Sequence, residues 1–594
     1  MTGEEDSAGR RQSGLRTFVR LLAFLGPYRA SFVVSSVLAI ASQVAGIGIP
    51  VVTGVVIDEL ESANGRDTRV IAFAIAGIVA LGVVRALLML GRRLISGRQA
   101  LAVEYDIRDE LYSHFLRLSF GFYDRSQTGQ LMSRATIDLQ SVRFFLGYGL
   151  IFFAQHVVTV VLVTAVLFVL DWRLALVALA ITPIVVFTAA RYSRVSHPVL
   201  RDVQQKIADV ATVAEESIVG VHVVKSFSQE ERRDEQFARA ADSVFDRTLA
   251  ANRQRAIYVP FLTFLPLVAQ AAVLLFAGRM VVSGSMSIGQ FVTFNLLLAM
   301  LVMPLRMLGM WIGQAQRATA AGERIFEVLD EPEEVADRSD AQPLPAGPGH
   351  VRFQGVHFGY DPDRLVLEDI ELDIAPGRTV ALIGRTGSGK TTIASLVPRF
   401  YDVVAGRVIV DGHDVRDVQR RSLRSEIGVI SQDPFLFSAS VRDNIAFGLP
   451  EASHETVEAA ARAAQAHEFI EELQHGYDTV IGERGITLSG GQRQRIAIAR
   501  ALLIDPRILI LDDATASVDA TTEAKIRAGL REVMRGRTTI IIAHRLSTIA
   551  LADEIVVLDG GGIAARGTQA DLLDESPLFR EIHEHGLLQQ VVAG

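Results

Sequence analysis

A glycine-rich loop between Gly384 and Thr392 has the residue types and spacing that phosphate binding requires. In such a loop, backbone N–H groups and one lysine surround the phosphates of a nucleotide, and a hydroxyl reaches Mg²⁺. The strand-like residues 380–383 precede the loop, and a helical segment begins at Thr391, which is the context that makes a glycine pattern a credible phosphate site. The predicted phosphate-binding residues are Gly384, Thr386, Gly387, Ser388, Gly389, Lys390, Thr391 and Thr392.

Two further motifs narrow the chemistry. Residues 508–511 form a buried strand that ends in Asp512, whose carboxylate could hold Mg²⁺ through water together with the Thr391 hydroxyl. Taken alone, Asp512 could equally cap a core strand. Residues Leu488–Gln492, with the sequence LSGGQ, follow the loop and indicate an ATP-driven machine rather than nucleotide binding in general.

The elements that must position these residues belong to more than one domain. A chain of 594 residues exceeds the size of a single hydrophobic core, and its first half holds most of the long apolar runs. The net charge of -8 provides no concentrated basic face, so we expect no nucleic-acid partner. The sequence has no cysteine, which excludes disulfides, thiolate nucleophiles and cysteine metal sites.

The first half of the chain is predicted to cross a membrane six times, because a span needs about 20 mostly apolar residues. The fourth span is the weakest, since it is short and contains Pro183. Only residues 171–173 separate it from the third span, as in a helical hairpin. The predicted spans are residues 31–57, 70–90, 146–170, 174–190, 257–282 and 288–312.

Basic residues in the connections predict the orientation of these spans. Segments 91–145 and 191–256 carry eight and eleven Lys or Arg, whereas 58–69 and 171–173 carry two and one. Both long connections, both termini and the nucleotide motifs are therefore expected in the cytoplasm. We expect the long connections to be helices that project beyond the membrane, each interrupted by a short transverse helix, near residues 119–129 and 220–227.

Polar groups near the membrane are few. Residues 15–25 carry two arginines and form either an amphipathic interfacial helix or the start of the first span, and no signal peptide is expected. For Arg85 and Arg306, which lie toward the cytoplasmic side, we expect a structural role. For His156, beside Gln155, we expect interhelical hydrogen bonding rather than ligand binding.

With these motifs in this order, the chain resembles a half-transporter of the ABC exporter family, which includes bacterial multidrug and lipid exporters, over residues 15–585. The resemblance implies a multidomain fold with a six-helix α-helical transmembrane domain, including the interfacial helix, in residues 1–329. It also implies an α/β P-loop nucleotide-binding domain in residues 351–594. Residues 330–350, which are acidic and rich in proline and glycine, form the predicted linker. ATP and Mg²⁺ are the implied cofactors.

The resemblance also assigns roles to single residues. Tyr360 matches the aromatic that stacks on adenine, and Gln432 matches the glutamine that links magnesium and water to the membrane helices. Asp519 matches the aspartate at the dimer interface, His544 the γ-phosphate sensor, and residues 482–485 the loop that touches the partner's coupling helix. In this family, the signature residues of one chain complete the ATP site of another, so a second half-transporter is an implied partner. Those signature residues are Ser489, Gly490, Gly491 and Gln492.

One position departs from the family pattern. Asp513 stands where the family has the glutamate that orients or deprotonates the attacking water. Its side chain is shorter by about 1.5 Å, and a displacement of that order can cost about 100-fold in rate. Because the signature and His544 are retained, we predict a heterodimer whose partner carries glutamate and an altered signature. A homodimer with working Asp513 sites is the alternative.

The cargo is only broadly indicated. Few charges and several aromatic and methionine side chains in the spans favour lipophilic or amphipathic cargo, such as drugs or lipids. The family resemblance implies that this cargo is exported by alternating access across the bacterial inner membrane. For any one of these side chains, lipid-facing or helix-packing surface is the better explanation. Siderophore import and a regulatory nucleotide switch are the alternative functions. The side chains concerned are Phe152, Phe153, Phe291, Phe294, Met300 and Met303.

Overall fold

The computed structural model describes residues 14–61, 68–361, 364–482, 488–512, 520–543 and 545–592. It divides the chain into two compact units. The helical unit contains the chain up to Phe115 and Gly129–Asp330, and the α/β unit contains Leu116–Thr128 and the chain from Glu331 onward. The segment Leu116–Thr128 therefore packs with the α/β unit, although it lies between two membrane helices in the sequence.

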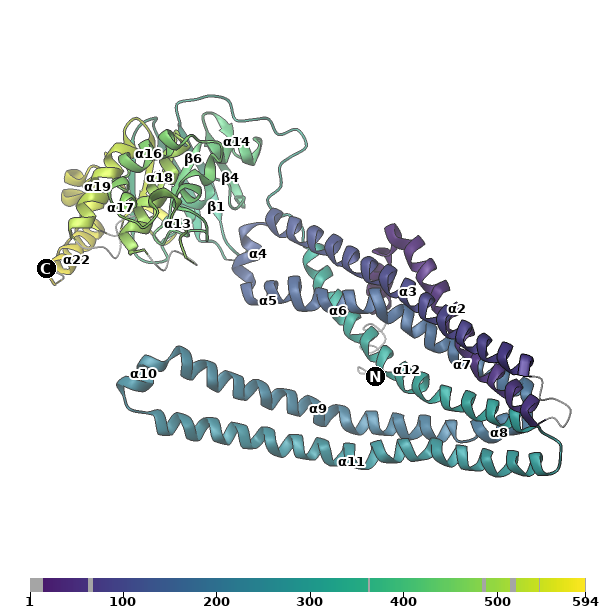
Figure 1. Cartoon of the computed structure of the whole chain (residues 1–594). Coiled ribbons are helices and arrows are strands. Elements are labelled where there is room, and N and C mark those ends of the chain that lie inside the picture. Colours follow the sequence, from purple (N-terminus) through teal and green to yellow (C-terminus); the bar gives the residue numbers. More distant parts are fainter. Residues whose placement is uncertain are drawn as a thin grey trace. The chain divides into compact units, whose positions relative to one another are not determined.

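In the described part of the helical unit, six helices are long and apolar enough to cross a membrane, which confirms the six predicted spans (Figure 1). Helix α3 has 50 residues and is therefore about 75 Å long, more than twice the roughly 30 Å of a hydrocarbon core. The long helices are α2 (Arg29–Glu61), α3 (Thr68–Arg117), α7 (Leu150–Leu170), α9 (Thr182–Val219), α11 (Glu230–Val282) and α12 (Ile288–Leu329).

Shorter elements complete the spans and the connections. Both transverse helices expected from the sequence are present, as α4 (Phe120–Arg125) and α10 (Val221–Ser226). The third span enters α7 through several short segments, two of which are π-helical turns. These segments are α5 (Thr128–Ser133), η2 (Arg134–Asp138), α6 (Leu139–Phe144) and η3 (Phe145–Gly149); α8 (Trp172–Leu179) precedes α9, and η1 (Gly26–Tyr28) precedes α2.

The hairpin between the third and fourth spans is as short as the sequence suggested. The Asp171 carboxylate caps α8 by accepting hydrogen bonds from the backbone N–H of Arg173 at 2.8 Å and of Leu174 at 2.9 Å. The fourth span breaks after α8, and Pro183 lies in the first turn of α9. Proline fits there because it lacks the N–H that the first turn leaves unpaired.

Helices α2 and α12 approach each other closely where α12 begins. Asp58 of α2 accepts hydrogen bonds from the Ser287 hydroxyl at 2.7 Å and from the Gly289 N–H at 2.6 Å. A Cβ atom on Gly289 would lie 2.0 Å from the Gly54 carbonyl oxygen. Only glycine therefore permits this contact.

Residues 14–23 form a separate helix, here called the N-terminal helix. It buries Leu21 against Gly322 of α12, and the ring of Phe18 lies 5.9 Å from that of Phe145. Arg20 donates a 2.6 Å hydrogen bond to Asp330. Of the two possibilities for this segment, the structure shows a helix packed on α12 rather than the first turns of α2.

The ionisable groups of the spans differ in their surroundings. Arg85 packs over Gly46 of α2, where a Cβ atom would lie 3.2 Å from the guanidinium carbon, and Arg306 is exposed. His156 stacks on Phe152 with ring centroids 6.3 Å apart. Its Nδ1 is buried and finds no hydrogen-bond partner among the described residues, so the interhelical bond expected there is not formed by that nitrogen.

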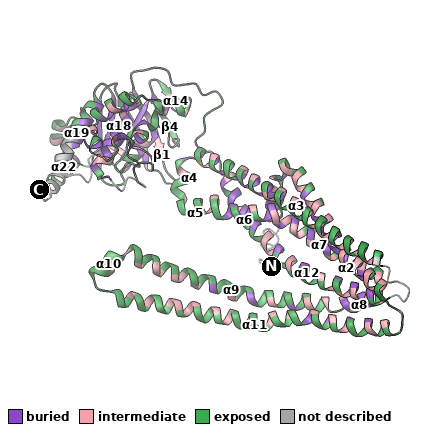
Figure 2. Cartoon of the chain, in the orientation of Figure 1, coloured by how far each residue is buried: buried purple, intermediate pink, exposed green. Residues whose placement is uncertain are grey.

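Helices α9 and α11 run side by side, with α10 at their tip (Figure 1). Most of their residues are intermediate or exposed, in contrast to the buried faces where α12 packs on α2 and α7 (Figure 2). In α9 the buried residues are only Thr188, Ser196 and Val203. This helix pair therefore leaves most of its length without a partner in the described chain.

The α/β unit contains two sheets. A six-stranded sheet has the order β10-β9-β3-β8-β7-β6, parallel except for β10, and a four-stranded antiparallel sheet has the order β2-β1-β4-β5. The strands are β1 (Val351–Phe358), β2 (Leu367–Ile374), β3 (Thr379–Gly384), β4 (Ala405–Val410), β5 (His413–Asp414), β6 (Ile427–Ile430), β7 (Ile508–Asp512), β8 (Thr538–Ile542), β9 (Glu554–Asp559) and β10 (Gly562–Gly567).

Helices surround these sheets. The central strands β3, β7 and β8 are almost continuous buried apolar runs, as expected for parallel strands covered on both faces. The helices are α13 (Lys390–Leu396), α14 (Arg420–Ser425), α15 (Val441–Ile445), η4 (Ala446–Gly448), α16 (His454–Ala463), α17 (His467–Glu471), η5 (Gly476–Asp478), α18 (Gly490–Leu503), α19 (Ala520–Met534), α20 (Leu546–Ile549), α21 (Gln569–Glu575) and α22 (Pro577–Val592).

The segment 331–350, at the predicted linker, lies along the α/β unit. Val335 is buried, Arg399 donates a 3.0 Å hydrogen bond to the Ala336 carbonyl, and the Leu344 N–H donates to the Ser422 hydroxyl at 2.7 Å. These bonds attach the extended chain to the domain that follows it.

Candidate nucleotide site

The glycine-rich loop joins the end of β3 to the start of α13. Gly384, Gly387 and Gly389 have φ angles of +152°, +84° and +96°, a region that favours glycine. A Cβ atom on Gly389 would also lie 2.4 Å from Cδ2 of Leu367. The loop conformation therefore depends on glycine at these positions, and it leaves the backbone accessible to a ligand.

Lys390 begins α13 and folds back over the loop. Its Nζ donates hydrogen bonds to the carbonyl oxygens of Gly384 at 2.9 Å and Arg385 at 3.0 Å. Burial lowers the pKa of Lys390, and the nearby charge of Asp512 partly opposes this shift. The Ser388 hydroxyl is buried and has no hydrogen-bond partner among the described residues. Because buried polar atoms are normally paired, this orphaned hydroxyl and the ammonium fit a phosphate group.

A cavity of about 190 Å³ brings together two of the three predicted magnesium-site residues; the third, Gln432, does not line it. Thr391 and Asp512 both line it, together with Ser431. They meet because β3 and β7 both pair with β8, so the ends of these parallel strands lie at one edge of the sheet. The described residues contain no group of three His, Cys, Asp or Glu that could hold a metal. One hydroxyl and one carboxylate, completed by phosphate and water, are a donor set that Mg²⁺ accepts.

Gln432 follows β6 and is exposed. Two side chains of α18 hold the segment on either side of it: Gln494 donates to the Ser431 carbonyl at 3.2 Å, and Arg500 donates to the Phe435 carbonyl at 3.1 Å. Arg500 also donates to the carbonyl of Asn444 at 2.8 Å. The glutamine segment is therefore attached to α18.

The signature residues form the start of the same helix. The Ser489 hydroxyl accepts a hydrogen bond from the N–H of Gln492 at 3.2 Å, and the Gln492 side chain accepts one from the N–H of Ser489 at 2.8 Å. This capping box fixes the helix terminus, and Ser489 and Gly490 are exposed. The positive end of a 14-residue helix favours an anion. None of the four signature residues lines the cavity that contains Thr391 and Asp512.

Tyr360 lies near the start of α13. Its hydroxyl is 3.1 Å from the Thr392 hydroxyl, and its ring meets those of Phe358 and Tyr401 edge-on, at 5.1 and 5.3 Å. Tyr360 is 50% exposed, so part of the ring is accessible to a base. The remaining predicted residues, Asp513, Asp519, His544 and residues 483–485, lie outside the described part of the chain.

Sequence reasoning missed the attachment of α4 to this site. The Tyr401 hydroxyl donates a 2.6 Å hydrogen bond to Asp124, and the rings of Phe120 and Phe400 are 4.5 Å apart. Phe120 also lines the cavity that contains Thr391 and Asp512. Burial, and then the bond to Asp124, raise the pKa of Tyr401. Because the two partners are 277 positions apart, no local sequence pattern indicates this contact.

Comparisons with known proteins agree with this geometry. The model for the ABC transporter transmembrane region matches residues 32–305, and the ABC transporter model matches residues 367–516. The Bacillus subtilis (strain 168) ABC transporter ATP-binding protein YknU is 36% identical over 571 residues, which cover 96% of this chain and 97% of that protein. The chain belongs to the ABC transporter family.

Other members have exporter names. An ATP-dependent lipid A-core flippase of Syntrophus aciditrophicus (strain SB) is 35% identical over 98% of this chain and 97% of its own length. A multidrug efflux ATP-binding/permease protein of Mycobacterium tuberculosis (strain H37Rv) is 38% identical over 95% of this chain, but over only 47% of its own length. A bacterial Atm1-family ABC exporter with ATP bound has a TM-score of 0.78 and 30% identity, covering 95% of this chain and 98% of that one.

These likenesses confirm the expected fold, a six-helix transmembrane domain followed by an α/β ATPase domain. The protein is a multi-pass membrane transporter of the exporter type, and its ABC domain is an ATPase coupled to transport. ABC domains bind ATP and generally need Mg²⁺. The roles of single residues remain predictions.

Proposed function

We propose that this chain is one half of an ATP-driven exporter of lipophilic or amphipathic compounds that works by alternating access. The observation that carries this proposal is the separation of its two phosphate-binding elements. Lys390, Thr391 and Asp512 lie around one site, whereas Ser489 at the exposed start of α18 is not among the residues that line the cavity with Thr391 and Asp512. Each chain thus offers a phosphate loop to one ATP and a signature to another.

A second half-transporter is the partner that the helical unit needs. Long parts of α9 and α11 carry exposed apolar side chains in stretches that are too polar to lie in lipid. Such surface on a helix outside the membrane marks a protein contact. The side chains concerned include Leu200 and Ile207 on α9 and Phe237, Phe245 and Leu249 on α11. The Mycobacterium tuberculosis relative, about half of whose length this chain matches, is long enough to hold two halves.

The described residues suggest how the site works. With ATP present, the Lys390 ammonium exchanges the carbonyl oxygens of Gly384 and Arg385 for phosphate oxygens, and the Ser388 hydroxyl gains the partner that it lacks. Bound Mg²⁺ would neutralise phosphate charge, held by Thr391 and Asp512. Tyr360 would stack on adenine. Closure of two chains around ATP then moves α4 and α10, which open the helices toward the other side of the membrane.

Asp513 decides which partner is required. We propose that its short carboxylate serves poorly as general base, so that the site with Lys390 holds ATP while the partner's site, completed by this chain's signature, turns over. The partner would then carry glutamate and an altered signature. A homodimer in which Asp513 acts through a longer water bridge is the alternative.

Steady-state ATPase activity of this chain alone in lipid nanodiscs tests this assignment. We expect near-zero turnover that Asp513→Glu restores and that Lys390→Ala removes again. Robust Lys390-dependent turnover with little gain from glutamate would instead establish a working homodimer. Binding of a fluorescent ATP analogue should survive in the wild-type chain and be lost in Lys390→Ala.

Cargo, direction and location complete the proposal. The names of the flippase and multidrug relatives support lipid-like or drug-like cargo, moved out of the cytoplasm across the bacterial inner membrane, with both termini and the ATPase domain cytoplasmic. A nucleotide switch that moves nothing is the competing function. Nucleotide-dependent uptake of a lipophilic dye into inside-out vesicles that contain the assembled transporter would exclude the switch, and its absence across a dye panel would favour it.

A further inference from the structure

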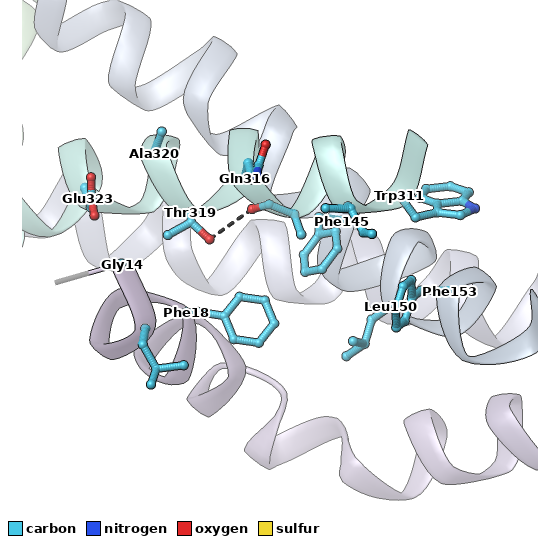
Figure 3. A pocket seen from close by; sticks show the side chains of 13 residues that line it. Gly14, Phe18, Phe145, Leu150, Phe153, Trp311, Gln316, Thr319, Ala320 and Glu323 are labelled. Atoms are coloured by element: carbon cyan, nitrogen blue, oxygen red, sulfur yellow. Dashed lines mark hydrogen bonds between the residues drawn. The ribbon is translucent and has the colours of Figure 1, made fainter. Parts of the chain in front are cut away.

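The helical unit contains a cavity of about 570 Å³ between the N-terminal helix, the η3–α7 segment and α12. Aromatic and aliphatic side chains from all three elements line one part of it, and Figure 3 shows them around a common space. The main apolar lining residues are Phe18, Phe145, Leu150, Phe153 and Trp311. None of these residues belongs to the nucleotide site.

The two ends of the cavity differ in polarity. Trp311 and Glu323 lie at opposite ends in Figure 3, on the same helix α12. Twelve helical residues separate them, which corresponds to about 18 Å along the axis. Between them, the Thr319 hydroxyl is satisfied, because it donates a 2.9 Å hydrogen bond to the Ala315 carbonyl. The cavity is therefore an elongated apolar space that ends at a carboxylate.

The carboxylate of Glu323 is half-buried, and in the described part of the chain no hydrogen bond or ion pair engages it. Two arginines on the same helix bind other groups. Arg324 is within electrostatic reach but pairs with Asp138, and Arg317 donates to Gln314 at 2.9 Å. Among the described residues, this negative charge at the end of an apolar cavity thus has no ion-pair partner.

The opposite end is rich in π-electrons. The indole of Trp311 stacks on Phe152 at 5.4 Å and on Phe144 at 5.9 Å. Such rings attract cations and large apolar groups alike. A neutral ligand would leave the Glu323 carboxylate unpaired, and an anionic ligand would be repelled by it.

We propose that this cavity binds one amphipathic monovalent cation, with its charged group beside Glu323 and its apolar body against the aromatic residues that extend to Trp311. The carboxylate supplies the counter-charge in surroundings poorer in water than the surface. The size and shape of the cavity suit one elongated molecule rather than a folded polypeptide. That such a cation is cargo rests on the proposed transport function, whereas the binding itself does not.

The chain offers a direct optical test, because Trp172 and Trp311 are its two tryptophans. In the Trp172→Phe protein, only Trp311 emits. The probe is the trimethylammonium derivative of diphenylhexatriene, which absorbs where tryptophan emits, and uncharged diphenylhexatriene is its matched control. Both are titrated in nanodiscs without nucleotide. We expect saturable energy transfer from Trp311 to the cationic dye, and only a linear, partition-driven signal with the uncharged dye.

Two variants locate the site. Glu323→Gln should weaken binding of the cationic dye by about 10-fold, whereas Glu327→Gln, a carboxylate one turn further along α12 that pairs with Arg134, should leave it unchanged. Ala315→Leu keeps the Glu323 carboxylate but places a larger side chain in the cavity. It should therefore remove the saturable signal. The Trp311→Phe protein, which emits only from Trp172 at the start of α8, measures partition into the lipid.

Equal affinity for the two dyes, a signal that never saturates, or an affinity unaffected by Glu323→Gln would each overturn the proposal. The readout needs no ATP hydrolysis. Absence of nucleotide-dependent transport by the assembled transporter would therefore contradict the proposed function alone, and absence of dye binding in an active transporter would contradict this site alone.

Discussion

The hydrogen bond between Tyr401 and Asp124 should hold α4 on the ATPase domain. The hydroxyl oxygen and the carboxylate oxygen are 2.6 Å apart. Hydrogen bonds to charged groups contribute about 1.5–3 kcal/mol. Because both side chains remain partly accessible to water, we expect a value just below this range, about 1.4 kcal/mol. That value corresponds to a tenfold change in the equilibrium for local opening of α4. The raised pKa of Tyr401 keeps its hydroxyl protonated, and able to donate, at neutral pH.

Hydrogen–deuterium exchange of the full-length protein in nanodiscs measures this opening in the peptide that contains residues 116–128. Tyr401→Phe should raise its exchange rate about tenfold, while the contact between Phe120 and Phe400 keeps α4 attached. Asp124→Ala should have a similar effect. The double variant should exchange no faster than the faster single variant, because both substitutions remove the same bond.

Tyr112→Phe is the matched control, since Tyr112 is an exposed tyrosine on α3. Its exchange in the 116–128 peptide should equal that of the wild type. An unchanged rate in Tyr401→Phe, or fully additive effects of the Tyr401 and Asp124 substitutions, would refute the reasoning.

Three further predictions concern pH and packing. Because burial lowers the pKa of Lys390, its ammonium is lost at a lower pH than that of an ordinary lysine. As pH rises, affinity for a fluorescent ATP analogue should therefore begin to fall before the ordinary lysine pKa of about 10.4 is reached. The hydrogen bond from Arg125 lowers the pKa of Glu334, so its stabilisation of α4 is present above the ordinary glutamate pKa and is lost as pH falls through the depressed value. Glu334→Gln should raise exchange of the 116–128 peptide at neutral pH and remove its acid dependence below about pH 4.5, after correction for intrinsic exchange. Gly289→Leu should lower the thermal denaturation temperature, because overpacking costs about 1–3 kcal/mol. Gly278→Leu is the control and should not lower it, because a Cβ atom at Gly278 meets nothing within 4 Å. Equal denaturation temperatures for the two variants would contradict the close approach at Gly289.

The features that could be predicted from the sequence are those that depend on neighbouring residues in the chain. Apolar length predicted the six spans. The phosphate-loop pattern predicted a helix from Thr391, and α13 begins one residue earlier, at Lys390. Each depends on residues that lie close together in the sequence. The position of Asp512 beside Thr391 also followed, because parallel strands end at one edge of a sheet.

Long-range contacts could not be predicted in this way. The bond between Tyr401 and Asp124 joins segments that no periodicity connects, and the packing of α4 with the α/β unit divides the chain at a point inside its first half. His156 shows a second limit, because its buried Nδ1 has no hydrogen-bond partner among the described residues. An interhelical hydrogen bond needs a donor or acceptor at the right height on a neighbouring helix. Hydropathy places a helix but does not fix its rotation or height against its neighbours.

Helix α18 would couple the two ATP sites of the proposed dimer. Its first turn carries Ser489, and its Gln494 and Arg500 hold the segment that contains Gln432. A helix of 14 residues is a stiff rod about 21 Å long. A displacement of its first turn is therefore transmitted to its other end. In the proposed dimer, a nucleotide held by the partner would press on the start of α18, while Gln432 serves the nucleotide held by this chain. The conformation of each ATPase domain would then depend on the occupancy of both nucleotide sites. Slow ATP turnover at one site would therefore set the rate of turnover at the faster site.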